Sequence, residues 1–298
     1  MATTDVERRQ WTQQGTQEAA QATYAAVKKA IERSSALDGK VEVFLQGSYA
    51  NHTNTRGDSD VDVVVMSTTT FVPQTDLLTP EERGRERAAG EPATMTGLGF
   101  RGLVEQALVD YFGSQRVRAK EKCLRVDKRD GYVDADVVPT FGVQRYTSYP
   151  PYGTPKFVEG IAIHPLTGGR IINYPKEHRA NGARKNEECG KLYKPTVRQV
   201  KRLRRKAVDA GLVDKKAAPG YLLECLVFNV PPDRFDADDS QRLLSVMRWL
   251  WTRTTQDMIG QLLRFKSCDE IHSLFINDPG NHDVDRAARV ISAMAKFM

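Results

Sequence analysis

The chain has 298 residues, of which 40% are hydrophobic and 28% are charged, and its formal net charge is +6. These values are typical of a globular protein with one large or two smaller domains, and they exclude a mostly disordered or fibrous chain. The apolar runs are far shorter than the roughly 20 residues that cross a bilayer, and the N-terminal segment lacks the apolar core of a secretory signal.

The spacing of the cysteines and the net charge narrow the class of protein further. The four cysteines lie far apart in the sequence, without the paired spacing of a zinc site or a disulfide framework. We therefore expect reduced thiols and a cytoplasmic protein. The modest positive charge favours an anionic ligand, but it does not separate a nucleotide from a polymer.

The first half of the chain reads as a mixed α/β region. The Ala- and Gln-rich segment 5–33 carries apolar residues at helical spacing and predicts one long helix. Residues 41–45 and 61–65 read as strands joined by the polar segment 46–59. Residues 67–99 contain Pro73, Pro80 and Pro92 and predict a surface excursion with one short helical turn at most.

A helix over 100–112 follows, and then two strands at 120–126 and 132–138, the second ended by Pro139. After a Pro- and Gly-rich patch at 149–154, the chain changes character. Helical patterns recur at 195–210, 219–229, 238–255 and 283–297. We therefore predict two domains, 1–150 with the sheet and 151–298 with mostly helices.

The densest chemical signal is the run QGSYANHTNTRGDSDVDVVV at 46–65. Gly47 and Ser48 follow a predicted strand, where glycine allows close approach of a ligand and the serine hydroxyl can donate to a phosphate oxygen. Such a pair is more often an ordinary turn, so by itself it leaves both readings open.

Asp60 and Asp62 lie two residues apart at the start of an apolar strand, so both side chains point to one face. Two adjacent carboxylates repel each other unless a cation lies between them, and their oxygens are ligands that Mg²⁺ prefers. The alternative is a solvated pair at a turn. The valines of the strand favour burial and hence the metal site.

A second acidic pair lies in the strand YVDADVVPTF, where Asp134 and Asp136 share one face. If this strand lies beside the first, a third acid joins the metal site. Three acids can hold two Mg²⁺ ions about 3.5–4 Å apart, which activate an attacking hydroxyl and neutralise a leaving pyrophosphate. The alternative is an edge strand with an exposed polar face.

A basic helix completes the candidate set. Arg198, Lys201, Arg202 and Arg205 fall at i, i+3, i+4 and i+7 and predict one positive stripe. The alternative is a solvated helix face.

These segments together resemble known nucleotidyltransferases. The run QGS, the strand GDSDVDVVV and the later DVVP resemble the core of the DNA polymerase beta superfamily. The segments YPKEHRANGARKNEECGKLYKPTVRQVKRLRR and PGYLLECLVFNVP resemble the helical half of bacterial cyclic-oligonucleotide synthases, the cyclic GMP-AMP synthase-like and DncV-like enzymes called CD-NTases. The matching segments extend from about residue 46 to residue 231.

The resemblance implies an α+β fold, with a polymerase-beta-like sheet lobe and a C-terminal helical lobe like that of oligoadenylate synthases, which close on an active-site cleft. It implies a metal-dependent enzyme that joins NTPs, ATP among them, into a cyclic di- or trinucleotide with release of pyrophosphate. It also implies antiphage signalling through a separate effector protein, by a monomer that needs neither nucleic acid nor a membrane.

The resemblance further assigns roles to residues. It implies two Mg²⁺ ions, replaceable by Mn²⁺, on the catalytic acids Asp60, Asp62 and Asp136, which leaves Asp134 as the less favoured acid. The nucleotide-binding residues that it implies are Gln46, Gly47, Ser48 and Lys201.

One departure from the family concerns the next helix, where a Ser beside a Tyr is common and this chain has Gly220 beside Tyr221. Tyr221 can stack on a base or belong to the core.

Two other functions remain open from the sequence. The first is a template-independent RNA 3′-end nucleotidyltransferase, which the basic helix could serve. The second is a basic nucleic-acid-binding module without catalysis, in which the acids are structural.

Overall fold

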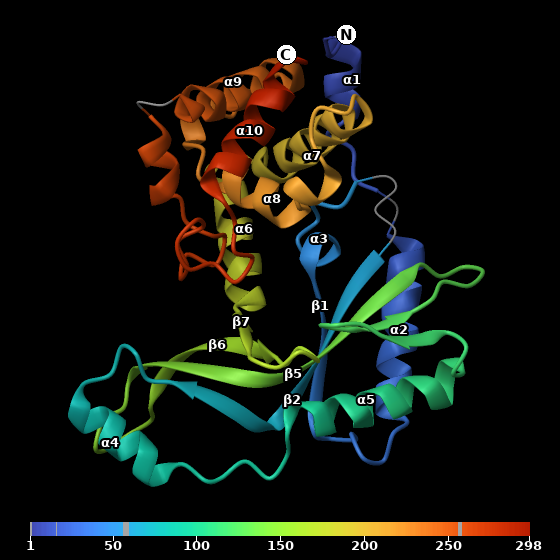
Figure 1. Ribbon diagram of the computed structural model, residues 1–298, viewed down its shortest axis with the longest axis vertical. Coiled ribbons are helices and arrows are strands. Elements are labelled where there is room, and N and C mark those ends of the chain that lie inside the picture. The colour runs from blue at the N-terminus through green and yellow to red at the C-terminus, as the bar shows by residue number, and fades with distance from the viewer. Residues whose placement is uncertain (1, 16, 56–59, 256–257) are drawn as a thin grey trace. The chain divides into compact units, whose positions relative to one another are not determined.

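The computed structural model describes residues 2–15, 17–55, 60–255 and 258–298 (Figure 1). The segment Gly57 to Ser59 of the acidic motif therefore lies outside the described residues. The chain divides into two compact units. The sheet unit comprises Gln17–Gln46 and Ser59–Lys176, and the helical unit comprises Met1–Thr16, Gly47–Asp58 and Glu177–Met298. The division into domains 1–150 and 151–298 stays a prediction.

The sheet unit is built on one mixed sheet in which the strands follow the order β1-β2-β5-β4-β3. On a side branch, β6 pairs with β5 and β7 pairs with β6. Strands β2 and β5 are parallel, and the other described pairs are antiparallel. The strands are β1 (Val41–Gln46), β2 (Asp60–Gln74), β3 (Val117–Ala119), β4 (Leu124–Val126), β5 (Asp134–Ser148), β6 (Lys156–Ile163) and β7 (Ile171–Asn173).

Two helices of the sheet unit, α2 (Glu18–Glu32) and α5 (Gly97–Phe112), pack against each other and against the central strands β2 and β5 (Figure 1). Apolar residues alternate with acids at the start of both strands, and Val61, Val63, Ala135 and Val137 are fully buried. Since alternate residues of a strand face opposite ways, the acids are directed to the other face of the sheet.

Both central strands are longer than predicted because they continue through prolines. The prediction that Pro139 ends its strand is wrong, since β5 runs on to Ser148. Pairing with β4 stops at Val137 and pairing with β6 starts at Thr140, so Pro139 lies where no strand is paired on that side. A residue without an N–H is tolerated there. Likewise, Pro73 lies beyond Ser67, the last residue of β2 that pairs with β1.

Segment 67–99 also differs from its prediction. It contains the end of β2 and the helix α4 (Pro80–Ala89), which is more than one short turn. Pro80 begins the helix instead of breaking it, since its missing N–H has no partner in the first turn. Thr79 and Glu82 form a reciprocal capping box. No residue of α4 is buried, so its predicted surface position is confirmed.

The helices of the helical unit are α1 (Asp5–Gln10), α3 (Gly47–Ala50), α6 (Pro175–Glu188) from Glu177 onward, α7 (Tyr193–Asp209), α8 (Gly220–Phe228), α9 (Asp239–Trp251) and α10 (Val284–Ala295). The four helical patterns predicted in the second half are confirmed as α7 to α10. The β6–β7 hairpin and α6 were not predicted. The core of the unit is formed by apolar side chains of α7 to α10, among them Val197, Leu203, Leu223, Leu226, Leu243, Val246 and Ile291.

The predicted single helix over 5–33 is wrong, because it is two helices, α1 and α2. The segment between them is held by residues 54–55 of the helical unit. The Gly15 N–H donates to the carbonyl of Asn54 at 3.3 Å, and a Cβ at Gly15 would lie only 2.8 Å from the carbonyl oxygen of Thr55. A helix cannot continue through a backbone held this closely.

Two further expectations concern the cysteines and membranes. The four cysteines are free, as predicted, although Cys225 and Cys268 have their sulfurs 3.4 Å apart in the core. In the described segments, we find no helix whose length and apolar character would let it cross a bilayer.

Candidate active site

One row of polar side chains crosses four neighbouring strands of the sheet unit. In register from β1 to β4, the row contains Gln46, Asp62, Asp136 and Arg125. Asp60 pairs with Asp134 in the parallel row two residues earlier. Paired residues of neighbouring strands have their side chains on one face, so the acids lie together. The two acidic strands are therefore neighbours, which is the condition under which the second acidic pair joins the first.

Arg125 connects the acids of both rows. Its guanidinium lies 2.9 Å from Asp60, 2.7 Å from Asp134 and 3.1 Å from Asp136. Hydrogen bonds to Asp60 and Asp136, together with their charges, raise the pKa of Arg125 despite its burial. Burial, with Asp136 beside it, also raises the pKa of the Cys123 thiol to about 12. The negative potential of the acidic face thus attracts and holds a cation.

The acids suit a divalent cation by their chemistry. Carboxylate oxygens on rigid strands are the ligands that Mg²⁺ prefers, and a guanidinium already occupies a cationic position among them. Among the residues with described positions, no three Asp, Glu, His or Cys side chains are gathered closely enough to hold a metal ion. The acids thus fit a divalent metal by the chemistry of their oxygens but not by their spacing, because Arg125 lies among them.

The predicted phosphate-binding turn belongs to the helical unit. Gly47 has a φ of 69°, in the left-handed region that favours glycine, and Ser48 follows it in α3. The Ser48 carbonyl accepts from the N–H of Thr53 at 2.9 Å, and the Gly47 carbonyl accepts from Asn51 at 3.1 Å. Glycine is therefore required at residue 47 by the backbone of the turn itself.

Lys201, predicted as a triphosphate contact, is buried beneath this turn. Its ammonium donates to the carbonyl and the hydroxyl of Thr53 at 3.1 and 3.2 Å and lies 3.7 Å from Glu224. The hydroxyl of Thr53 donates to Glu224 at 2.9 Å, and His178 lies 3.0 Å from the other carboxylate oxygen. At Lys201, the basic stripe of α7 is therefore not a solvated helix face, because this side chain is buried and joins α7 to the turn.

Burial alone would raise the pKa of Glu224, but the charges of His178 and Lys201 and the hydrogen bonds from His178 and Thr53 outweigh it and hold this pKa at about 2. The carboxylate is thus ionised and balanced by cations at neutral pH. We infer that these residues fix the turn that carries Ser48.

More cations surround the same turn. Arg198 donates to the carbonyls of Thr12 and His52, both at 2.6 Å. Burial lowers the pKa of His52, and the positive charges of Lys194, Arg179 and Arg198 lower it further. Burial and the neighbouring arginines likewise lower the pKa of Lys194. Mutual repulsion of this kind indicates an electropositive site that an anion would stabilise.

The departure at Gly220 has a structural counterpart. A Cβ at Gly220 would lie 3.4 Å from the Lys201 side chain, so the start of α8 packs directly on that lysine. Tyr221 donates its hydroxyl to Asp278 at 2.9 Å and packs on the rings of His178 and His282. These contacts support a core position for Tyr221 and not a role in stacking on a base.

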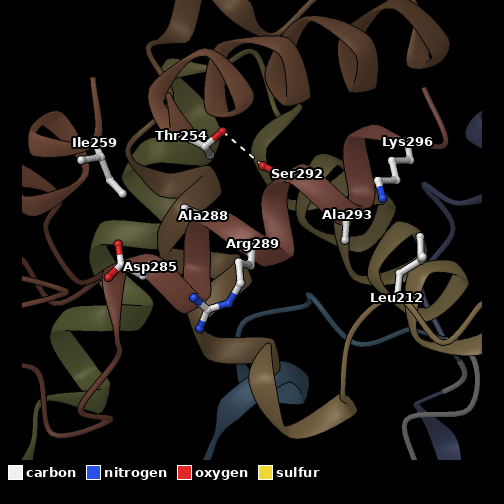
Figure 2. Close-up of a pocket in the computed structure, with 9 residues that line it drawn as sticks. All are labelled: Leu212, Thr254, Ile259, Asp285, Ala288, Arg289, Ser292, Ala293 and Lys296. Atoms are coloured by element: carbon white, nitrogen blue, oxygen red, sulfur yellow. Dashed lines mark hydrogen bonds between the residues drawn. The ribbon is translucent and has the colours of Figure 1, made fainter. Parts of the chain in front are cut away.

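A separate groove of about 640 Å³ runs along α10 in the helical unit (Figure 2). None of the predicted site residues lines it. The lining is formed by Leu212, Thr254, Ile259, Asp285, Ala288, Arg289, Ser292, Ala293 and Lys296. The groove is therefore distinct from the candidate active site.

Sequence reasoning missed Arg125, Thr53, His178 and Glu224. For Arg125 a signal exists, because it is the basic residue between two buried residues, Leu124 and Val126, of a strand next to an acidic one. For the other three we find no pattern in the sequence, since their neighbours come from separate segments of the chain.

The parallel acidic strands and the helices of the other unit define a class, and comparison with known families agrees. Residues 27–93 match the nucleotidyltransferase domain, and residues 180–298 match the cGAS/DncV-like nucleotidyltransferase C-terminal helical domain. The chain is a nucleotidyltransferase. The predicted fold class, a nucleotidyltransferase sheet lobe with a C-terminal helical lobe, is confirmed.

Individual relatives are more specific. The chain is 37% identical to a cyclic UMP-AMP synthase of Rhodothermus marinus over 95% of this chain and 93% of the relative. It is 37% identical to the cyclic dipyrimidine nucleotide synthase CdnE of Legionella pneumophila over 71% and 70% of the two chains. The solved structure of the R. marinus CdnE c-UMP-AMP synthase with Apcpp and Upnpp matches at a TM-score of 0.85 and 34% identity, covering 99% of this chain and 96% of that one.

The chain belongs to the CD-NTase family of cyclic nucleotide synthases, and the predicted family is confirmed. Nucleotidyltransferases of this kind use divalent metal ions and NTP substrates.

Proposed function

We propose that this chain joins two NTPs into a cyclic dinucleotide and releases two pyrophosphates. The observation that carries the proposal is the register of β2 and β5, which places Asp62 beside Asp136 and Asp60 beside Asp134 on one face of the sheet. Acids on rigid, adjoining strands could hold divalent ions, and these ions would supply the positive charge that binds a reacting phosphate group.

In each transfer, a ribose hydroxyl oxygen of one nucleotide attacks the α-phosphorus of a triphosphate, the bond to pyrophosphate breaks, and the hydroxyl proton is lost. Asp60, Asp62 and Asp136 would hold two Mg²⁺ ions, replaceable by Mn²⁺, which lower the pKa of the attacking hydroxyl and neutralise the leaving pyrophosphate. Asp136 is placed nearest the attacking hydroxyl in this scheme.

Gly47, Ser48 and Lys201 are proposed to bind the triphosphate, with Gln46 at the end of the polar row. The support lies in the positive φ of Gly47, in the position of Lys201 beneath the turn, and in the cations Arg179, Lys194 and Arg198 around it. A triphosphate would relieve the repulsion among these cations.

For the bases, we propose ATP and UTP. The R. marinus relative, which this chain matches over nearly its whole length, is named a cyclic UMP-AMP synthase. The L. pneumophila relative, at the same identity, is named a dipyrimidine synthase, which also supports a pyrimidine substrate.

The test is incubation of the full chain with four NTPs, each labelled in turn, with Mg²⁺ and without RNA. The products are then treated with phosphatase and analysed by mass spectrometry. A phosphatase-resistant product that carries label from ATP and UTP is expected. Product only after RNA is added would indicate an RNA-tailing enzyme instead, and no product with either would favour a binding module without catalysis.

The same proposal includes a cytoplasmic monomer that acts without nucleic acid or a membrane, whose product acts on a separate effector protein in antiphage defence. Size-exclusion chromatography of the purified chain tests the monomer.

A further inference from the structure

We propose that Arg125 is a built-in competitor of the divalent metal. It neutralises the carboxylates that are proposed to bind metal, and it must release Asp60, of which it contacts both oxygens, before this acid can bind a metal ion. The inference rests on the proposed function of the acids as metal ligands, and it assigns a positioning role to a residue outside that set.

The first argument is the distribution of partners around the guanidinium. Arg125 binds Asp60 and Asp136, which belong to the proposed ligand set, and Asp134, which does not. Asp60 is contacted by both terminal nitrogens, at 2.9 and 3.1 Å. Of Asp136 it contacts Oδ1. A carboxylate oxygen that accepts a hydrogen bond from a guanidinium cannot offer the same lone pair to a metal ion, so Asp60 is the acid for which Arg125 competes.

The second argument is electrostatic. Asp60, Asp62, Asp134 and Asp136 share one face of the sheet, and like charges so close destabilise a fold unless a cation lies among them. The side chain of Arg125 is only 11% exposed, so its attraction is weakly screened by water. Arg125 thus neutralises carboxylates that a bound metal ion would neutralise in its place.

The third argument is that Asp134 can keep the guanidinium of Arg125 in position after its other contacts are broken. Its contact with Asp134 is the shortest of the three ion pairs at 2.7 Å, and Asp134 is less exposed than Asp60. Asp134 is fixed in turn by the backbone N–H of Lys128 at 2.7 Å. Asp134, which the family resemblance leaves as the less favoured acid, therefore anchors Arg125 when Asp60 is released.

The test measures Mn²⁺ binding to the full, nucleotide-free chain by the EPR signal of free Mn²⁺. Arg125→Gln removes the guanidinium, and we expect it to bind Mn²⁺ about tenfold more tightly than the wild type. Without divalent ions its Tm should fall, and added Mn²⁺ should raise its Tm by more than it raises that of the wild type.

Two further variants make the result specific. Arg125→Lys keeps the charge but cannot bridge several carboxylates, so an intermediate affinity is expected, and this variant decides the question if Arg125→Gln does not fold. Arg118→Gln removes an exposed arginine of the same sheet that pairs with Asp127. We expect it to bind Mn²⁺ as the wild type does.

Equal or weaker Mn²⁺ binding by folded Arg125→Gln or Arg125→Lys overturns the inference, and so does an equal gain in Arg118→Gln, which would reveal a general charge effect. Product formation by the wild type is measured separately. A wild type that makes product while Arg125→Gln gains no affinity refutes only the role of Arg125. A wild type without product refutes the proposed function.

Discussion

The sheet unit and the helical unit hold their charged groups by different means. On the sheet, strand register directs the acids to one face, where Asp60 is 43% exposed and Asp136 is 25% exposed. In the helical unit, Glu224 is 4% exposed and Lys201 7%, and hydrogen bonds from separate segments hold them. Strand register fixes the positions of the acids but lets them exchange one cationic partner for another. The stability of the buried network, in contrast, depends on every residue in it.

The comparison predicts that substitutions on the sheet change activity and that substitutions in the buried network change stability. The largest effect is expected for Asp136→Asn. Since this removes a proposed metal ligand, cyclic product should fall by about 1,000-fold, while the Tm changes little because the side chain is partly exposed. Mass spectrometry of the product and a thermal melt by circular dichroism measure the two effects.

Asp127→Asn is the matched control, because Asp127 is an acid of the same sheet whose described partner is the exposed Arg118. It should retain nearly all activity. An Asp136→Asn enzyme with more than about a tenth of wild-type activity would contradict the assignment of this acid to catalysis.

A large effect on stability is expected for Glu224→Gln. Removing one member of a buried ion pair leaves Lys201 without its counter-charge, which typically costs about 3–5 kcal/mol in the free energy of unfolding. Urea denaturation at pH 7 measures it. Glu188→Gln is the control, since Glu188 pairs with Arg184 on an exposed helix face and such pairs contribute under about 1 kcal/mol.

The same carboxylate predicts a pH dependence. His178, Lys201 and Thr53 hold the pKa of Glu224 at about 2 against its burial, below its ordinary value of 4.5. A depressed carboxylate pKa stabilises the fold above the unfolded value, and this contribution is lost as the pH falls from 4.5 toward 2. The wild type should lose this stability over that interval, and Glu224→Gln should lack this part of the loss.

The smallest effect concerns Lys201, which belongs to the buried network and is proposed to bind nucleotide. Lys201→Met combined with Glu224→Gln removes both charges, so the double variant should be more stable than the sum of the single losses predicts, with a coupling of about 1–3 kcal/mol. If Lys201 also contacts the triphosphate, the KM for ATP should be about tenfold higher in the double variant than in Glu224→Gln.

Lys206→Met is the control, since Lys206 lies on the same helix and pairs with Glu7 at 3.2 Å. An unchanged KM in the double variant would confine Lys201 to a structural role.

The acidic part of the site could be predicted from the sequence because strands have a period of two. That period places Asp60 with Asp62, and Asp134 with Asp136, on one face, and apolar neighbours indicate central strands. The amphipathic helices of the second half were also predictable, because their apolar residues recur at the spacing of one helix face, which packs into the core. The pairing of β2 with β5 was inferred only as a possibility, because strand order is not encoded locally.

The buried network and the role of Arg125 could not be predicted in this way. Thr53, His178, Lys201 and Glu224 lie in four separate segments, and only the folded helical unit brings them together. Pro139 misled the prediction of β5 for a related reason. Whether proline ends a strand depends on which neighbours pair beside it, and that is a property of the sheet.

The close approach of Gly15 to residues 54–55 makes the conformation of the turn around Thr53 sensitive to a substitution in the linker before α2. Any side chain at this position pushes on the carbonyl of Thr55, two residues from Thr53, whose hydroxyl and carbonyl meet Glu224 and Lys201. A single methyl group placed in the linker before α2 would thus displace the turn that is proposed to bind phosphate, without altering any residue proposed to touch a nucleotide.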